Sequence, residues 1–216
     1  MKPSNATNKQ LPKKTKLKMK NLIFSLSCIW LVIALAATAQ EESNSPVLDT
    51  SGQPLQRGVE YYIKPAATEM GGPFTLIDRN GFCPFYVGQQ NVSVDGIPVS
   101  FSPFEEEEST VREGKNFKVA FSGATTCVQS TTWKVGETEP RTQRRLIATG
   151  DNAGYSNYFY INKYEEFENI YSIQWCPTEL CPTCRFICGA FGSLFENGKR
   201  LAALDGSALG VVFERA

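Results

Sequence analysis

The chain has 216 residues, of which 42% are hydrophobic and 20% are charged, which is typical of one globular domain or two small ones. Its formal net charge is zero, but residues 1–39 hold seven lysines and no acidic residue, so residues 40–216 carry a net charge of −7. An acidic body argues against a nucleic-acid partner, and the lack of any histidine excludes Ser-His-Asp catalysis, Cys-His catalysis and histidine-ligated zinc.

The first predicted element is a secretory signal peptide over residues 1–39. Residues 22–37 are apolar and follow a lysine-rich stretch, and Ala37-Thr38-Ala39 has the small-x-small pattern of a cleavage site. An apolar core of about 15 residues is short for a bilayer span, although an uncleaved anchor is the alternative. Met19 would open a signal peptide of more usual length. We therefore expect a secreted product, extracellular or vacuolar, without stable membrane association.

The rest of the chain is predicted to consist of strands. Short runs rich in β-branched and aromatic residues are separated by Gly, Pro, Asn and Asp, and helical periodicity is poor. Ten or more strands of this kind favour a sandwich or barrel. The aromatic-rich strands at 61, 117 and 171 lie 56 and 54 residues apart, which weakly indicates three repeated units. The predicted strands are 59–63, 74–77, 92–94, 99–101, 117–121, 133–135, 146–148, 158–161, 171–175 and 210–213.

Six of the seven cysteines lie beyond the predicted signal peptide, which contains Cys28. An even number in a secreted chain predicts three disulfides, and the sequence alone leaves 15 pairings open. Four of the six fall in CPTELCPTCRFIC, residues 176–188, where a zinc site and a redox CxxC are the alternatives. Zinc is disfavoured because four ligands within 13 residues are tight for one tetrahedron. Redox activity is disfavoured because no βαβ pattern surrounds the motif.

The stretch 47–63, VLDTSGQPLQRGVEYYI, resembles the N-terminal signature of the plant Kunitz inhibitors related to soybean trypsin inhibitor. Ser51 departs from this signature, and the positions that fit are Val47, Asp49, Gly52, Gln53, Leu55, Tyr61 and Ile63. Further blocks resemble the miraculin branch of the family. These are CPFYV at 83–87, GIPVSFSP at 96–103, TTCVQSTTWKV at 125–135, WCP at 175–177 and the closing segment 196–216.

The resemblance covers residues 46–216 and implies an all-β fold, a β-trefoil of twelve strands arranged as a pseudo-threefold barrel, in a domain spanning 40–216. It implies a binding protein and not an enzyme, with no cofactor and no metal, expected to be monomeric. One extra residue between the third and fourth of these cysteines is not expected to alter the disulfides. The pairs that the family implies are Cys83 with Cys127, Cys176 with Cys188, and Cys181 with Cys184.

Family members of this type inhibit serine endopeptidases through an exposed loop, and the matching loop here is 102–110. The resemblance places the reactive residues at Pro103, Phe104, Glu105 and Glu106, with Glu105 as P1, the side chain that enters the protease's specificity pocket. An acidic P1 predicts weak inhibition of trypsin, whose pocket is itself acidic. An Asn that commonly supports this loop is replaced by Arg57, which would either pair with the glutamates or leave the loop unsupported.

Other interpretations of this chain remain open at the sequence level. The run 105–108 is also typical of a solvated loop tip or a docking patch for a basic partner. The expected partner is a protease of the serine class or of the cysteine class. A non-inhibitory miraculin-like binding, defence or storage protein is the alternative function on the same fold. Asn91 opens an N-glycosylation sequon, Asn91-Val92-Ser93, on a predicted loop.

Overall fold

In the part of the chain that the structure describes, strands make up the regular structure, and helix is confined to two single 3-10 turns, η2 (Thr68–Met70) and η3 (Tyr155–Asn157). The computed structural model describes residues 45–91, 96–127, 130–151 and 154–216. The predicted signal peptide and the predicted strand 92–94 lie outside these residues. The strands are β1 (Glu60–Pro65), β2 (Phe74–Ile77), β3 (Tyr86–Gln89), β4 (Val99–Pro103), β5 (Phe117–Phe121), β6 (Trp133–Thr138), β7 (Arg145–Thr149), β8 (Tyr160–Lys163), β9 (Tyr171–Trp175), β10 (Gly189–Ala190), β11 (Gly192–Glu196), β12 (Lys199–Ala203) and β13 (Val211–Arg215).

Six strands close into a barrel. Strand β1 pairs with β13 on one side and with β4 on the other, β4 pairs with β5, and β9 pairs with both β13 and β8, all antiparallel. An isolated bridge between Phe117 and Phe159 joins β5 to the start of β8. Its two backbone hydrogen bonds, of 2.8 and 2.9 Å, complete the ring, so the barrel has no free edge on which another chain could add a strand.

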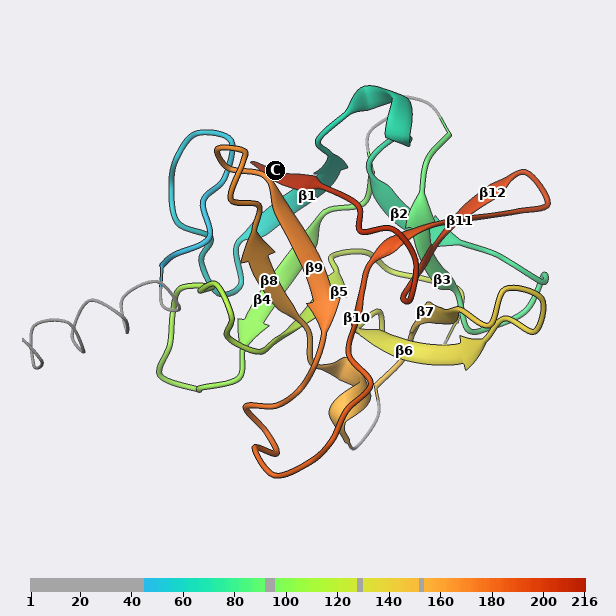
Figure 1. Cartoon of the computed structure of the whole chain (residues 1–216). Coiled ribbons are helices and arrows are strands. Elements are labelled where there is room, and N and C mark those ends of the chain that lie inside the picture. The colour runs from blue at the N-terminus through green and yellow to red at the C-terminus, as the bar shows by residue number, and fades with distance from the viewer. Residues whose placement is uncertain (1–44, 92–95, 128–129, 152–153) are drawn as a thin grey trace, which may run out of the picture. The chain divides into compact units, whose positions relative to one another are not determined.

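Three hairpins form a second sheet that caps the barrel. They are β2–β3, β6–β7 and β11–β12, and they are joined because β3, β7 and β12 pair with one another. Figure 1 shows these hairpins gathered on one side of the barrel strands β1, β4, β5, β8 and β9. A six-stranded barrel capped by three hairpins is a β-trefoil, which confirms the predicted fold class.

The threefold repeat is also confirmed, because β1, β5 and β9 each begin a unit of one barrel strand, one hairpin and a second barrel strand. The described residues form thirteen strands where twelve were expected. The extra one arises because Phe191 separates the short β10 from β11. Phe191 is buried in the core. Its N–H donates to the carbonyl of Ile173, and its carbonyl accepts the N–H of Leu209, so neither group pairs with a hairpin partner.

The core is aromatic and follows the alternation of the barrel strands. Phe101 lies at its centre, edge-to-face with Phe117 and Phe213 at centroid distances of 5.3 and 5.7 Å. Trp133 stacks between Phe74 and Phe191 beneath the hairpin cap. Such offset and edge-to-face pairs add stability beyond the area that they bury.

The six cysteines form three disulfides, as predicted. Their pairs are Cys83–Cys127, Cys176–Cys188 and Cys181–Cys184, the pairing that the family resemblance implied. Every thiol beyond the predicted signal peptide is therefore used in a disulfide, which leaves none to act as a zinc ligand. The Cys181–Cys184 bond is also the form that an oxidised CxxC pair takes, so redox activity stays a sequence-level alternative. Within the described part of the chain, no helix has the length and apolar character that crossing a bilayer requires.

Candidate functional site

The predicted reactive loop connects β4, which ends at Pro103, to β5, which begins at Phe117. Pro103 is buried in the barrel wall. The chain then projects outward, so that Phe104 and the first three glutamates of 105–108 are exposed. The Phe104 ring is held edge-to-face against Tyr158 at 5.6 Å. The loop therefore presents its four residues 104–107 to solvent from a fixed point of departure.

A tight turn sets the shape of the loop tip. The N–H of Glu108 donates to the carbonyl of Glu105 at 3.1 Å, which closes a four-residue turn. At the base, the N–H of Phe104 donates to the carbonyl of Asn116 at 2.8 Å and so extends the β4–β5 ladder by one residue. The tip is thus a hydrogen-bonded structure and not an unsupported run of acidic residues.

Arg57 binds the inner side of this loop. Its Nε donates to the carbonyl of Glu108 at 2.9 Å, and its Nη2 donates to the carbonyls of Pro103 and Glu105 at 3.1 and 2.6 Å. Its backbone N–H also donates to the carbonyl of Ser109 at 2.7 Å. Of the two outcomes that the sequence left open, Arg57 therefore does contact the glutamate run, and it does so through the backbone carbonyls of Glu105 and Glu108. A guanidinium has several donors in one plane, and here they hold three backbone oxygens that converge on it.

Glu108 is the glutamate of the run that turns back into the loop. Its carboxylate accepts a bond from the N–H of Thr110 at 3.1 Å and pairs with Nε of Arg112 at 3.0 Å. The Thr110 N–H and then Arg112 lower the pKa of Glu108 below its ordinary value. Glu108 therefore belongs to the support of the loop, together with Arg112, while Glu105–Glu107 remain available to a partner.

The returning half of the loop is paired with the segment that carries the N-terminal signature. The N–H of Val111 donates to the carbonyl of Leu55, and the N–H of Val47 donates to the carbonyl of Val111, both at 2.9 Å. Asp49 is buried, and its Oδ1 accepts the N–H groups of Ser51 and Gln53 at 2.8 and 2.9 Å. This Asp49 turn brings the chain back on itself, so that Arg57 arrives under the loop.

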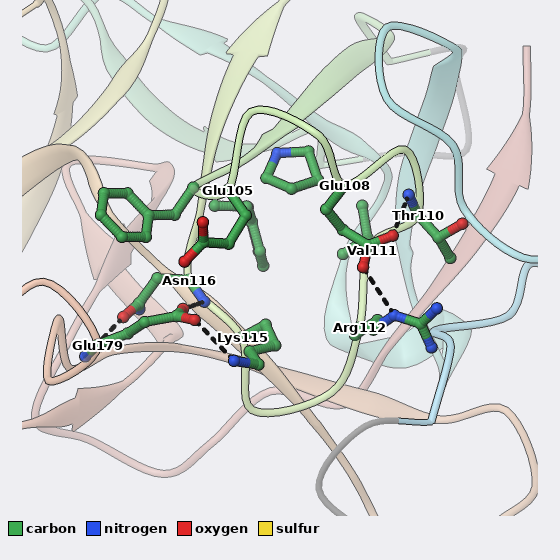
Figure 2. Close-up of a pocket in the computed structure, with 11 residues that line it drawn as sticks. Glu105, Glu108, Thr110, Val111, Arg112, Lys115, Asn116 and Glu179 are labelled. Carbon is green, nitrogen blue, oxygen red and sulfur yellow. Dashed lines mark hydrogen bonds and ion pairs between the residues drawn. The ribbon is translucent and has the colours of Figure 1, made fainter.

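A pocket of about 310 Å³ lies between this loop and the cysteine-rich segment 176–188 (Figure 2). Glu179 of that segment accepts bonds from Nζ of Lys115 and from the N–H of Asn116, both at 2.8 Å. Glu179 first, and more weakly Glu105 and Glu108, raise the pKa of Lys115. Figure 2 shows Glu105 pointing from the loop toward the side of the pocket where Asn116 and Glu179 lie. The two surface loops are therefore joined at their bases.

Comparison with known proteins agrees with this architecture. The family model of Kunitz trypsin and protease inhibitors matches residues 47–215. The chain belongs to this family. The Kunitz type trypsin inhibitor 111 of Medicago truncatula is 44% identical over 199 residues, covering 89% of this chain and 96% of that protein. Miraculin of Synsepalum dulcificum is 30% identical over 220 residues, covering 91% of this chain and 98% of miraculin. The solved structure of a Kunitz-type cysteine protease inhibitor from potato superposes with a TM-score of 0.71 at 29% sequence identity, covering 80% of this chain and 98% of the potato protein.

The Kunitz signature explains the position of Arg57 but not the contacts of the pocket. Lys115, Asn116 and Glu179 were not singled out from the sequence, because Glu179 lies more than 60 residues from its two partners. No periodicity or motif links such distant positions. In the described ranges, no group of three or more Cys, Asp or Glu side chains is arranged to hold a metal ion.

The predicted glycosylation residue Asn91 is exposed at the end of the hairpin strand β3. Its side-chain amide donates to the carbonyl of Gly198 at 3.0 Å. The other two residues of the sequon, Val92 and Ser93, lie outside the described residues, and glycosylation at Asn91 stays a prediction.

Proposed function

We propose that this Kunitz chain inhibits an endopeptidase by presenting residues 103–106 as a pseudo-substrate, with Glu105 at P1. The observation that carries the proposal is the set of three hydrogen bonds from Arg57 to carbonyl oxygens of the loop. A loop that is already ordered loses little conformational entropy when it docks, which is how a short contact gains affinity. A solvated acidic tip without a partner would have no need of this support.

Charge decides which protease the loop fits. Trypsin has a carboxylate at the base of its specificity pocket, and Glu105 would bring a second carboxylate to it. Two like charges about 4 Å apart repel by about 4 kcal/mol at the effective dielectric of a protein surface, which corresponds to about 1000-fold in affinity. We therefore assign this loop to a protease with a basic or neutral pocket, of the serine or cysteine class, and not to trypsin.

The test is an inhibition panel with trypsin, chymotrypsin, a Glu-specific endopeptidase and papain. The proposal requires inhibition of at least one protease other than trypsin, and it requires that Arg57→Ala weakens that inhibition. Glu107→Gln is the matched control, because it removes one exposed charge outside residues 103–106 without touching the contacts of Arg57. If no protease of the panel were inhibited, the non-inhibitory alternative, a miraculin-like binding or storage protein, would be favoured.

We also propose that the protein acts outside the cytosol, in the extracellular space or the vacuole. Three disulfides in one domain are typical of an oxidising route, and the lysine-rich and apolar start of the chain has the pattern of a signal peptide. Mass spectrometry of the mature protein tests this, because cleavage after Ala39 predicts Gln40 as the first residue. A mature chain that retains residues 22–37 would contradict it.

A further inference from the structure

A second exposed loop, residues 181–188, presents the basic side chain that the first loop lacks. Arg185 is exposed and is the only basic residue between Cys176 and Cys188. None of the ion pairs or hydrogen bonds found among the described residues uses its guanidinium, its N–H or its carbonyl. Both the guanidinium and the backbone groups of Arg185 are therefore open to a partner.

The residues around Arg185 alternate between the surface and the body of the protein. Phe186 packs edge-to-face against Trp175 at 5.7 Å and against Tyr155 at 5.4 Å, while Ile187 is 82% exposed. The platform under Phe186 is itself held in place, because Nε1 of Trp175 donates to the carbonyl of Tyr155 at 3.0 Å. With Phe186 anchored against the body of the protein, its two neighbours Arg185 and Ile187 are both exposed to solvent.

Covalent and polar links fix both arms of this loop. Cys184, directly before Arg185, is bonded to Cys181, and a turn bond of 3.1 Å runs between the same two residues. Cys188, three positions after Arg185, is bonded to Cys176. The first arm is held by the contacts of Glu179 with Lys115 and Asn116. Links on both sides of Arg185 reduce the conformational entropy that the loop would lose on docking.

We propose that the segment Cys184–Ile187 is a second protease-binding loop, with Arg185 entering the pocket of a serine endopeptidase that has a carboxylate at its base. A guanidinium forms paired hydrogen bonds with a carboxylate, which is the charge match that Glu105 cannot provide. The free N–H and carbonyl groups of Arg185 and Ile187 would pair with the protease backbone in the manner of an added strand. The inference rests on the proposed function only in that the partner is a protease, since its residues are different.

Trypsin is the probe, and the inhibition constants of wild type, Arg185→Ala and Arg185→Lys are compared. We expect Arg185→Ala to weaken trypsin inhibition by at least about 100-fold, as loss of a central anchor residue does, and Arg185→Lys to stay within about 10-fold of wild type. Arg141→Ala, which removes an exposed arginine from the turn between β6 and β7, should inhibit trypsin like wild type. Melting temperatures of all variants check that the fold is unchanged.

Three results would overturn this inference: no trypsin inhibition by wild type, full inhibition by Arg185→Ala, or a loss on trypsin with Arg57→Ala as large as that with Arg185→Ala. The third would assign trypsin to the first loop. The two proposals fail separately. If another protease is inhibited in a way that depends on Arg57, and trypsin is not inhibited, the first loop is supported and the second loop is refuted. If trypsin is inhibited in a way that depends on Arg185 alone, the second loop is supported.

Discussion

Replacing Arg57 with alanine should release the loop tip while leaving the barrel intact. The substitution removes three hydrogen bonds, of 2.9, 3.1 and 2.6 Å, from a charged donor that is half-buried. At about 1 kcal/mol each for partly solvated bonds, the loss is about 3 kcal/mol. This raises the population of the open loop by about 100-fold. The backbone bond to Ser109 and the contacts of Glu108 survive, so the effect should stay within residues 103–108.

Limited digestion with a Glu-specific endopeptidase measures this opening directly, because the tip contains Glu105, Glu106 and Glu107. When a loop opens and closes faster than it is cut, the rate of cleavage follows the open population. Mass spectrometry should therefore detect cleavage in Arg57→Ala about 100 times faster than in wild type, and Arg57→Lys should be intermediate because one ammonium reaches fewer of the carbonyls. Equal cleavage rates with equal melting temperatures would refute the role assigned to Arg57.

Three further predictions concern pH and stability. Because the pKa of Glu108 is lowered, its hydrogen bonds stabilise the loop at neutral pH, and this stabilisation is lost as the pH falls through that pKa. Hydrogen exchange at the N–H of Thr110 should therefore become faster at low pH in wild type. In Glu108→Gln, the exchange rate should not show this additional pH dependence. Arg79→Met should lower the free energy of unfolding in urea by about 2 kcal/mol, because it removes charged hydrogen bonds from a largely buried guanidinium to Glu137 of β6 and Glu196 of β11. Removing the Cys83–Cys127 bond by serine substitutions should lower it by about 4 kcal/mol, since the bond spans 44 residues.

Matched variants separate these effects from general damage. Arg215→Ala removes an exposed arginine from β13 and should change the unfolding free energy by less than about 0.5 kcal/mol. Removing the Cys181–Cys184 bond, which spans only three residues, should cost about 2 kcal/mol, half the loss at Cys83–Cys127. Equal losses of unfolding free energy in Arg79→Met and Arg215→Ala, or on removing either disulfide, would contradict the corresponding argument. The argument for Glu108 would be contradicted if exchange at Thr110 depended on pH equally in wild type and Glu108→Gln.

Most barrel strands could be predicted from the sequence because buried and more exposed residues alternate along them, as in β1, β4, β5 and β13. In β1, for example, Tyr61, Ile63 and Pro65 are buried and alternate with more exposed residues. Of the cap strands, β2, β6 and β7 were predicted, whereas β3, β11 and β12 were missed; β3 and β12 do not alternate between buried and exposed residues. All four residues of β3 are buried, and a side chain at Gly88 would meet the carbonyl of Arg200 at 2.2 Å, so close strand packing demands glycine there. Strand β12 begins with two charged residues, and its three buried residues are consecutive.

The site was predictable as a location but not as a set of contacts. The Kunitz resemblance placed the loop at 102–110 and Arg57 beneath it, because both are defined by position in a motif. The sequence could not decide whether Arg57 meets carboxylates or carbonyls, since that depends on the turn at 105–108, which turns the backbone oxygens inward. Nor did Arg185 stand out, because its significance depends on Phe186 being anchored against Trp175.

Asn116 explains how one small domain can hold two loops in order at once. Its carbonyl accepts the N–H of Phe104 from the first loop, while its N–H and its Oδ1 bind the carboxylate and the N–H of Glu179 from the second. Asn116 is 3% exposed, and its amide also donates to the carbonyls of Phe159 and Cys176, which belong to the barrel and to the disulfide that closes the second loop. A buried polar residue with all its groups paired is a rigid junction. The charges that the two loops present can therefore differ, acidic at Glu105 and basic at Arg185, because the framework that orders them does not involve either side chain.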